Sequence, residues 1–552
     1  MLVNIEPFLG KKFFDDTLYS KRWNSMNLFI NSIQNKINVN KLAFKGDTTQ
    51  TTTPTIKPQQ PDTFEKQPVE ADIFYIADLH GKMTNMERIC SISKLFDNMK
   101  SDGVKLKLAS GDILLGSNPM TNKVASHFLN WIGVSANALG NHEMDATPDA
   151  LATTLSDAKY DLLASNVTVD PKSPMANKIK KSVIKEYNGQ KFGIIGTAPS
   201  DALERVGTRE SLEDIKIDDI DTTIKKVQEE VDKLRAQGIN KIIVLSHIGK
   251  EMDKRLAQET DGIDIILGGH THDLYKDVKE GDNLLYSKSN EPVLLTQIGK
   301  DGEYAGILKT AFDKDGVLVK AQNNVIKSTG FTRTLPFKTA VESIIGKPEI
   351  LAEIKTAPPA PQNRLISNNP HGNVIVDAMR HELGTDIAIL NAGNIRGFFP
   401  EGKIDSRRIN DVTPFEDKML ICNLSEKQIV DAIKVGAKSF EKSDNKPGIL
   451  LVSGLEYTVT DKGKLVDLNF VDKNGKKVPI NVDNPSETKK FTVACDDFFA
   501  YGGDNYLPVN SNPDYVVKKF DKDKNFYTAN YIKNQPQPLE IKEDDRIKII
   551  KG

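Results

Sequence analysis

Five short apolar runs, each ending in side chains that bind metal ions, constrain the fold of this chain more than any other feature. The run VSANAL leads into GNHEMD, residues 140–145, which holds Asn141, His142, Glu143 and Asp145. Burying such a cluster without partners would cost several kcal/mol, so these groups must bond to one another, bind metal or do chemistry. Taken alone, the segment would also fit an ordinary capped helix start.

The repetition of this pattern favours a shared site over a chance cluster. Near-continuous apolar runs are typical of strands buried on both faces, and α/β sheets collect ligands at the carboxyl ends of their strands. Five of the eight histidines follow these runs, whereas His127, His371 and His381 lie elsewhere. The other four runs are followed by Asp78, His80, Asp112, His247, His270 and His272.

Strand-like and helix-like segments alternate from residue 71 to about 327, which predicts a layered α/β domain. A helix is expected over 221–237, because four apolar residues share one face and Gly238 follows as a stop signal. The predicted strands lie within 73–76, 106–108, 134–139, 160–164, 191–196, 242–245 and 263–267.

A change of character at 336–361 predicts a connector between two domains. A helical stretch over 338–354 is interrupted by Pro348, and the proline-rich TAPPAPQ that follows is typical of a stiff linker. Residues 362–552 then predict a smaller mixed α/β domain. Its expected elements are a capped helix at 425–440 and strands at 450–460, 465–471 and 489–494, with Asn474-Gly475 as a hairpin turn.

Residues 1–70 lie outside both predicted domains. A weak amphipathic helix is expected over 19–37, and the Thr-, Pro- and Gln-rich stretch 46–70 is typical of a linker. Two interpretations stay open for this extension, a docking or targeting arm and a poorly ordered tail.

Composition excludes several classes of protein. The formal net charge of -2 and the lack of long single-sign runs argue against a dedicated nucleic-acid binder. No apolar run reaches the ~18 residues that a membrane-spanning helix needs. The first residues do not form a secretory signal, so a cytoplasmic location is the default expectation. Cys90, Cys422 and Cys495 are odd in number and far apart, which predicts buried free thiols.

The donors after the apolar runs predict a catalytic metal site. Carboxylates, imidazoles and one amide oxygen without a thiolate suit Mn²⁺, Zn²⁺ or Fe. Seven donors exceed the needs of one tetrahedral ion, so two divalent ions sharing a carboxylate are expected. Such a pair activates a water for in-line attack on phosphorus. His142 would then stabilise a phosphoryl oxygen or protonate the leaving group, with Asp145 fixing its tautomer.

The order and spacing of DLHG, GD, GNHEMD, LSHIG and GGHTHD resemble the calcineurin-like metallophosphoesterases. Together with NAGNIRG (391–397) and FFAYGGDNY (498–506), they make residues 71–552 similar to the bacterial two-domain 5′-nucleotidases. That group includes UDP-sugar hydrolases and cyclic-nucleotide phosphodiesterases. The resemblance implies a four-layer α/β phosphoesterase sandwich at 71–335, followed by a smaller mixed α/β substrate-binding domain at 362–552.

The activity that the resemblance implies is metal-dependent hydrolysis of nucleotide phosphoesters, most directly of nucleoside 5′-monophosphates. UDP-sugars, 2′,3′-cyclic nucleotides and sulfur esters are alternative substrates in the same kind of site. A nucleotide-binding protein without catalysis is the non-enzyme alternative, and the intact ligand set argues against it. Oligomeric state is left open.

The resemblance also implies a role for each residue of the metal site. The first ion would be held by Asp78, His80, Asp112 and His272. The second ion would be held by Asp112, Asn141, His247 and His270. His142 and Asp145 would form the catalytic pair.

In the second domain, the resemblance implies contacts to the substrate. Arg364 and Arg396 would meet the phosphate region, since arginine presents a planar fork to phosphate oxygens. A base would stack between two aromatic rings and hydrogen-bond to two polar side chains, through Phe415, Phe498, Asn391 and Asp504. The alternatives are core aromatics, a surface arginine and a simple turn at GGDNY.

Four departures from the family pattern are visible. Ala77 and Asn394 stand where the family usually carries Asn and Gly, and Asp417 replaces an expected Asn after the Pro-Phe pair. Arg364 is a single arginine where relatives carry two. The change at Asp417 leaves the base preference open.

Overall fold

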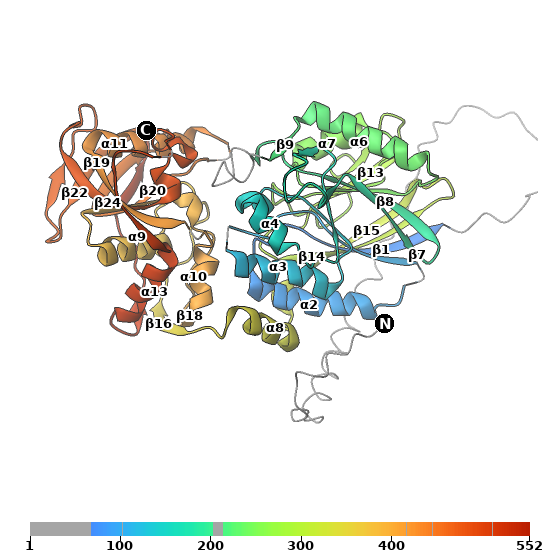
Figure 1. Ribbon diagram of the computed structural model, residues 1–552, viewed down its shortest axis with the longest axis horizontal. Coiled ribbons are helices and arrows are strands. Elements are labelled where there is room, and N and C mark those ends of the chain that lie inside the picture. The colour runs from blue at the N-terminus through green and yellow to red at the C-terminus, as the bar shows by residue number, and fades with distance from the viewer. Residues whose placement is uncertain are drawn as a thin grey trace, which may run out of the picture.

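The computed structural model describes residues 68–552, apart from 102, 117, 203–213, 416, 444 and 511. These residues form two domains that lie side by side (Figure 1). The predicted helix over 19–37 lies outside the described residues, as does the predicted linker up to residue 67. None of the described helices has the length and apolar character that crossing a membrane requires.

The first domain is built on two sheets. The larger sheet has the order β15-β14-β1-β2-β3-β4-β6 and the smaller one β12-β13-β11-β10-β8-β7. The larger sheet comprises β1 Val69–Ile76, β2 Val104–Ala109, β3 Ala136–Ala138, β4 Asp161–Leu163, β6 Ile179–Lys180, β14 Tyr304–Phe312 and β15 Leu318–Lys327. The smaller sheet comprises β7 Ser182–Tyr187, β8 Gln190–Thr197, β10 Ile242–Ser246, β11 Ile265–Leu267, β12 Leu284–Tyr286 and β13 Pro292–Thr296.

Helices cover the outer faces of both sheets, which confirms the predicted four-layer sandwich (Figure 1). The larger sheet is covered by α2 Met83–Asn98, α3 Pro119–Ile132 and α4 Pro148–Thr154, and α8 Leu335–Ile345 packs on the outside of α2 and α3. The smaller sheet is covered by α6 Ile220–Arg235 and α7 Lys250–Glu259. Three hydrophobic cores fill the spaces between the four layers. The predicted apolar face of α6 is buried in one of them, as the helical spacing of Ile224, Val227, Val231 and Leu234 indicates.

The second domain is a smaller mixed α/β unit with its own core. Its central sheet has the order β20-β17-β24-β19-β25, from β17 Ile387–Asn391, β19 Lys418–Ser425, β20 Leu450–Ser453, β24 Lys490–Asp496 and β25 Val516–Asp523. The smaller sheets hold β16 Ile350–Thr356, β18 Gly402–Asp405, β21 Leu455–Thr460, β22 Leu465–Val471, β23 Lys477–Pro479, β26 Leu539–Glu540 and β27 Ile547–Ile550. The helices are α9 Pro370–Leu383, α10 Ser406–Val412, α11 Glu426–Ala437, α12 Asp497–Ala500 and α13 Lys524–Asn534.

The predicted helix over 338–354 is wrong beyond Ile345. Gly346 has a φ of +81°, which ends α8, and residues from Ile350 onward form strand β16 instead. Strand β16 pairs with β18 and β26 of the second domain, whereas α8 packs on α3 of the first. The two elements of the predicted connector therefore belong to different domains.

Three further expectations can be compared with the structure. The predicted strand over 450–460 is divided by Gly454, whose φ of +78° separates β20 from β21. The three cysteines are buried free thiols, as predicted, although the Sγ atoms of Cys422 and Cys495 lie only 3.6 Å apart on neighbouring strands. The capping box at the start of α11, formed by Ser425 and Gln428, is confirmed.

Candidate metal centre and substrate-binding site

Loops at the carboxyl ends of parallel strands carry the predicted metal ligands. Strands β1, β2 and β3 run parallel in one sheet, and β10 and β11 run parallel in the other. Five ligand residues have φ between 48° and 78°, namely Asp78, His80, Asp112, His270 and His272. Left-handed backbone costs a non-glycine residue of order 1–3 kcal/mol, and such strain clusters at functional sites. The fold therefore holds these side chains in positions that local preference would not choose.

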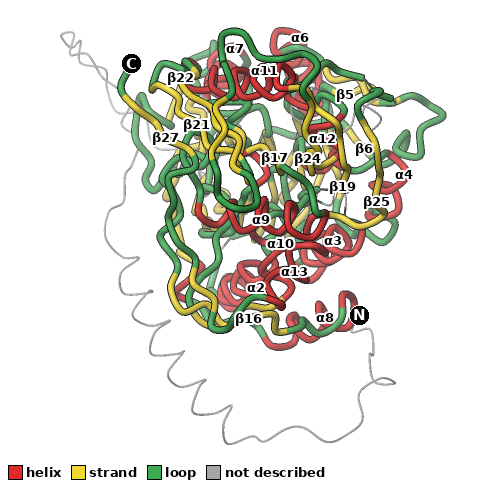
Figure 2. Tube along the Cα trace, turned by 90° about the vertical axis from the view of Figure 1, so that its left-hand side faces the viewer, coloured by secondary structure: helices red, strands yellow, loops and turns green. Residues whose placement is uncertain are grey.

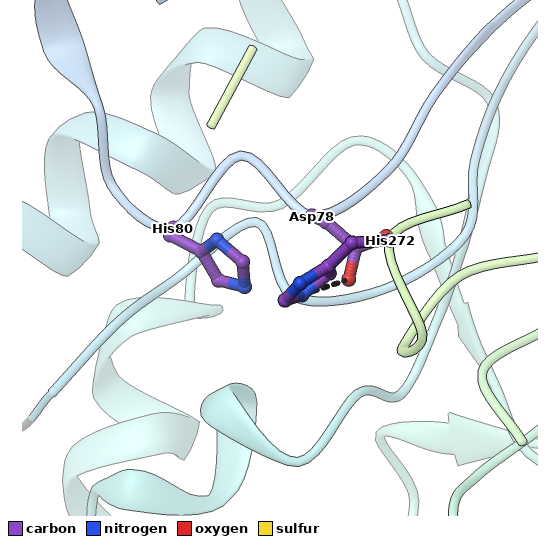
Figure 3. Close-up of side chains that lie close together, drawn as sticks. All are labelled: Asp78, His80 and His272. Carbon is purple, nitrogen blue, oxygen red and sulfur yellow. Dashed lines mark ion pairs between the residues drawn. The ribbon is translucent and has the colours of Figure 1, made fainter. Parts of the chain in front are cut away.

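The first candidate metal group consists of Asp78, His80 and His272 (Figure 3). Their ligand atoms lie within 4.8 Å of one another, and Nε2 of His272 is 3.5 Å from Oδ1 of Asp78. Asp78 and His80 are buried, whereas the side chain of His272 keeps 28% of its surface exposed. This group could hold a metal ion that is open toward solvent on one side.

The second candidate group consists of Asp112, His247 and His270, again with ligand atoms within 4.8 Å of one another. Asn141 joins it, because its Oδ1 lies 2.9 Å from Nδ1 of His270. The group combines loops that follow β2 and β3 of the larger sheet with loops that follow β10 and β11 of the smaller one. Tertiary packing therefore brings segments about 160 residues apart in sequence to one point.

Asp112 lies between the two groups. Its Oδ2 is 3.1 Å from Nε2 of His247 and 3.6 Å from Nε2 of His80. This position fits a carboxylate shared between two cation sites. His80, Asp112 and His142 form a third group of the same kind, so geometry alone also admits His142 as a ligand.

Orphaned polar atoms support the fit of a cation to these residues. Oδ2 of Asp78 and Nε2 of both His80 and His247 are buried without a hydrogen-bond partner. Such atoms are costly to bury, and a metal ion would satisfy all three. Burial is also the main reason why the pKa of Asp78 is raised to about 7. For His80, burial opposes protonation, but the carboxylates of Asp112 and Asp301 outweigh it and raise the pKa to about 9.

The sequence did not reveal the supporting roles of two carboxylates. Oδ1 of Asp301 lies 2.9 Å from Nδ1 of His80, which orients the imidazole so that Nε2 faces the first group. Glu143 accepts hydrogen bonds from the backbone N–H groups of Asp112, Ile113, Leu114 and Gly140, and so braces the loop that carries the shared carboxylate. Asp301 comes shortly after β13, which is another apolar strand. If β13 had been counted as a sixth apolar run followed by a polar ligand, Asp301 would have been predicted at this site.

The predicted catalytic pair is formed in the structure. Nδ1 of His142 lies 2.7 Å from Oδ2 of Asp145, and both side chains are buried. An ionised carboxylate only accepts hydrogen bonds, so Nδ1 donates and Nε2 is the nitrogen left for a substrate. Asp145 is held in turn by the backbone N–H of Gly116, at 2.7 Å.

The three motifs of the second domain meet at one edge of its central sheet. NAGNIRG begins at the last residue of β17, and FFAYGGDNY begins just after the end of β24, which is parallel to β17. The third motif, TPFED (residues 413–417), directly precedes β19, which is antiparallel to β24. Figure 2 shows these three strands side by side, viewed with the second domain toward the reader. The order of the strands therefore brings NAGNIRG and TPFED together with FFAYGGDNY, which lies far along the chain from both.

Arg396 and Phe415 face the catalytic pair of the first domain. The guanidinium of Arg396 lies 5.3 Å from the ring centre of Phe415, and that ring lies 6.4 Å from the ring of His142. Lys82 crosses between the domains, since its Nζ donates to the carbonyl oxygens of Arg396 and Asp411. These contacts bring the second-domain edge directly against the metal groups.

The remaining predicted contact residues lie along the same edge. Arg364 donates to the carbonyl oxygens of Ala392 and Gly393 at 3.4 Å, and burial together with Arg396 lowers its pKa to about 9. Oδ1 of Asn391 is buried without a hydrogen-bond partner, as expected of a group that awaits a ligand.

In FFAYGGDNY, Phe498 lies in α12, directly after β24, and Asp504 lies in the short turn that follows this helix. Phe498 and Asp504 are half-buried, and Asp504 has a φ of +53°. A Cβ on Gly503 would lie 2.7 Å from the Phe498 ring. Close packing against this ring therefore explains the second glycine of the motif.

Comparison with known proteins identifies both domains. Residues 71–274 match the calcineurin-like phosphoesterase family, and residues 351–510 match the 5′-nucleotidase C-terminal domain. The chain belongs to the two-domain 5′-nucleotidase family. It is accordingly a metal-dependent phosphoester hydrolase, and the family implies a divalent-metal site.

Individual relatives span both domains. The chain is 28% identical to a snake venom 5′-nucleotidase of Naja atra, over 80% of this chain and 92% of that protein. It is 26% identical to the trifunctional nucleotide phosphoesterase YfkN of Bacillus subtilis, over 79% of this chain but only 32% of that longer protein. The crystal structure of a 5′-nucleotidase precursor from Thermus thermophilus has the same fold, with a TM-score of 0.70 at 22% identity, covering 87% of this chain and 99% of that one.

Proposed function

We propose that this protein hydrolyses nucleoside 5′-monophosphates to a nucleoside and inorganic phosphate, using two divalent metal ions. The observation that carries the proposal is the position of Asp112, between the group of Asp78, His80 and His272 and the group of His247, His270 and Asn141. Ions of the Mn²⁺, Zn²⁺ or Fe class suit these oxygen and nitrogen donors. When bound, they would supply Lewis-acid activation of water and of the phosphoryl oxygens.

The side chains of the chain supply the remaining requirements of the reaction. Nδ1 of His142 donates to Asp145, which leaves Nε2 to bond a phosphoryl oxygen or to pass a proton to the departing 5′-oxygen. An uncharged leaving alcohol departs more easily than an alkoxide, so this proton favours cleavage. Arg364 and Arg396 neutralise the phosphate as the substrate enters.

The second domain would select the rest of the substrate. Phe415 and Phe498 offer two aromatic faces at the same sheet edge, and a base stacked on such rings gains roughly 1–3 kcal/mol. Asn391 and Asp504 offer hydrogen bonds to the base or the ribose. The orphaned Oδ1 of Asn391 supports this role, because a donor from the nucleoside would satisfy it.

The proposal is tested with a substrate panel on metal-reconstituted protein. We expect phosphate release from AMP with two ions per chain by elemental analysis, and loss of activity on chelation that Mn²⁺ restores. UDP-glucose, a 2′,3′-cyclic nucleotide and a sulfur ester are measured in parallel, so that the alternative substrates are ranked on the same sample. Zero phosphate release from every nucleotide, at full metal content, would leave a nucleotide-binding protein without catalysis.

A further inference from the structure

A lysine outside all the recognised motifs is buried at the edge where those motifs meet. Lys524 is the first residue of α13 and its side chain has no exposed surface. Its Nζ donates to the carbonyl oxygen of Phe415 at 2.6 Å and to Oδ2 of Asp417 at 3.0 Å, and lies 4.0 Å from Oδ2 of Asp496. A buried ammonium survives only with such partners, so its position is tightly specified.

Topology explains how a residue so late in the chain reaches this point. Strand β25 pairs antiparallel with β19, and Asp523 lies opposite Lys418. The end of β25 therefore lies beside the start of β19, just after TPFED. Helix α13 begins there, capped by Asp523, whose carboxylate accepts the N–H of Phe526.

The partners of Lys524 connect all three motifs. Asp496 ends β24 just before FFAYGGDNY and caps α12, the short helix that carries Phe498, by accepting the N–H of Phe499 at 2.9 Å. The other oxygen of Asp496 accepts from Nδ2 of Asn394, in NAGNIRG, at 3.2 Å. Oδ1 of Asn394 accepts in turn from the hydroxyl of Thr413, the first residue of TPFED, at 2.6 Å. One buried polar network thus joins the three segments.

Two of the departures from the family pattern belong to this network. Nδ2 of Asn394 lies 3.4 Å from Oδ2 of Asp417, the same oxygen that accepts a hydrogen bond from Nζ of Lys524. An aspartate in place of asparagine adds a negative charge beside Asp496, and the lysine balances it. Asn394, Asp417 and Lys524 therefore belong to one charge-compensated network.

We propose that Lys524 is the positioning residue that sets the two aromatic faces of the nucleoside site. It does so by holding the backbone of Phe415 directly and the helix of Phe498 through Asp496. It acts through other residues and touches no substrate. The inference rests on the proposed nucleotide hydrolysis, because only a substrate with a base would use both rings.

Without the ammonium group of Lys524, the carboxylates of Asp417 and Asp496 would have no positive charge beside them. Burial, together with Asp417, already raises the pKa of Asp496 to about 7 in spite of the opposing effect of Lys524. Without the cation, Asp417 and Asp496 would repel each other or take up a proton, and the two segments would separate. The spacing between the rings of Phe415 and Phe498 would then be lost.

The test compares AMP with ribose 5-phosphate, which carries the sugar and the phosphate but no base. The variant Lys524→Met keeps the aliphatic length of the side chain and removes its charge. We expect the ratio of kcat/KM for AMP to that for ribose 5-phosphate to fall about tenfold, which corresponds to about 1.4 kcal/mol, mainly through KM for AMP. Lys524→Arg, which retains the charge, should recover part of the ratio.

A merely structural role predicts a different result. General destabilisation would lower turnover of both substrates together and leave their ratio at the wild-type value, and that outcome would overturn the inference. The matched control is Lys522→Met, because Lys522 is exposed and precedes Lys524 by two residues. This control should keep the wild-type ratio.

A second variant covers the case in which Lys524→Met does not fold. The side chain of Asp417 is 24% exposed, so Asp417→Asn removes one partner of the lysine at a tolerant position. We expect the AMP to ribose 5-phosphate ratio to fall about threefold, and an unchanged ratio would overturn the inference.

Wild-type protein that hydrolyses ribose 5-phosphate as efficiently as AMP would instead overturn the proposed nucleotide function. If Lys524→Met keeps the wild-type preference for AMP over ribose 5-phosphate, the positioning role of Lys524 is overturned, whereas the proposed nucleotide hydrolysis stands.

Discussion

Oδ1 of Asp301 lies 2.9 Å from Nδ1 of His80, so a carboxylate outside the metal groups fixes the ring of a residue within them. His80 has two nitrogens that can bind metal, and this contact reserves Nε2 for the cation. The pKa of Asp301 is held far below its usual range, because His80 and two nearby lysines outweigh the effect of burial. Asp301 therefore stays ionised and acceptor-only at all working pH values.

Substitution of Asp301 should weaken metal binding without removing a ligand. Asp301→Asn preserves shape and tolerates the φ of +57° at this position, but it loses the charge that supports His80. We expect metal affinity to fall by roughly 10–100-fold, as for other partners of metal-bound imidazoles. Competition with a chromogenic chelator measures this affinity. The control Asp315→Asn, at an exposed residue paired with Lys314, should bind metal like the wild type.

Substitution of Asp145 should lower the turnover of AMP without changing the amount of bound metal. Asp145→Asn removes the charge that faces Nδ1 of His142 while keeping the size of the side chain. Because general acid catalysis contributes about 10²–10⁴-fold, we expect kcat for AMP to fall by about 100-fold or more. Elemental analysis of the same sample should give the wild-type metal content. A variant that keeps wild-type kcat would remove His142 and Asp145 from the proton-transfer role.

Substitution of Phe498, in the short helix α12, should change the substrate preference. Phe498→Leu keeps apolar volume for packing against Gly503 but removes the flat face for a base. Loss of stacking is worth roughly 1–3 kcal/mol, so we expect KM for AMP to rise about tenfold. Ribose 5-phosphate measures the part of the reaction that involves no base. An equal loss for both substrates would place Phe498 in the core instead.

A buried carboxyl far from the metal groups predicts how stability depends on pH. Asp264 precedes β11 and accepts the backbone N–H of Ile242 at 2.8 Å, and burial raises its pKa well above the usual value. The native state therefore keeps a proton that the unfolded chain has lost above about pH 4. Above about pH 4, the native protein therefore binds more protons than the unfolded protein. As the pH rises from about 4 toward the raised pKa of native Asp264, this residue lowers the free energy of unfolding.

Asp264→Asn should remove this contribution, since the amide does not titrate. Urea unfolding at pH 5 and pH 8 should show a smaller loss of stability for the variant than for the wild type. Phosphate release from AMP at one pH serves as the control for an intact active site. Equal losses in both proteins would show that Asp264 is ionised in the native state.

The sequence alone determined the chemistry of the metal groups and the layered fold that presents them. Asp78, Asp112 and Asn141 each follow an apolar run, and a run of that kind becomes a buried strand whose end carries ligands. Periodicity of two or 3.6 residues is a local property, so strands such as β10 and the buried face of α6 followed directly from it. Motif order then pointed to the family.

Tertiary structure decided which distant groups act on those ligands. Asp301 and Lys524 belong to no motif, and Asp301 lies 221 residues from its partner His80. Long-range pairing depends on strand order and on the left-handed loop residues, neither of which a local pattern records. The end of α8 at Gly346 and the strand that follows were missed for the same reason, because Ile350–Thr356 becomes a strand only through its partners β18 and β26.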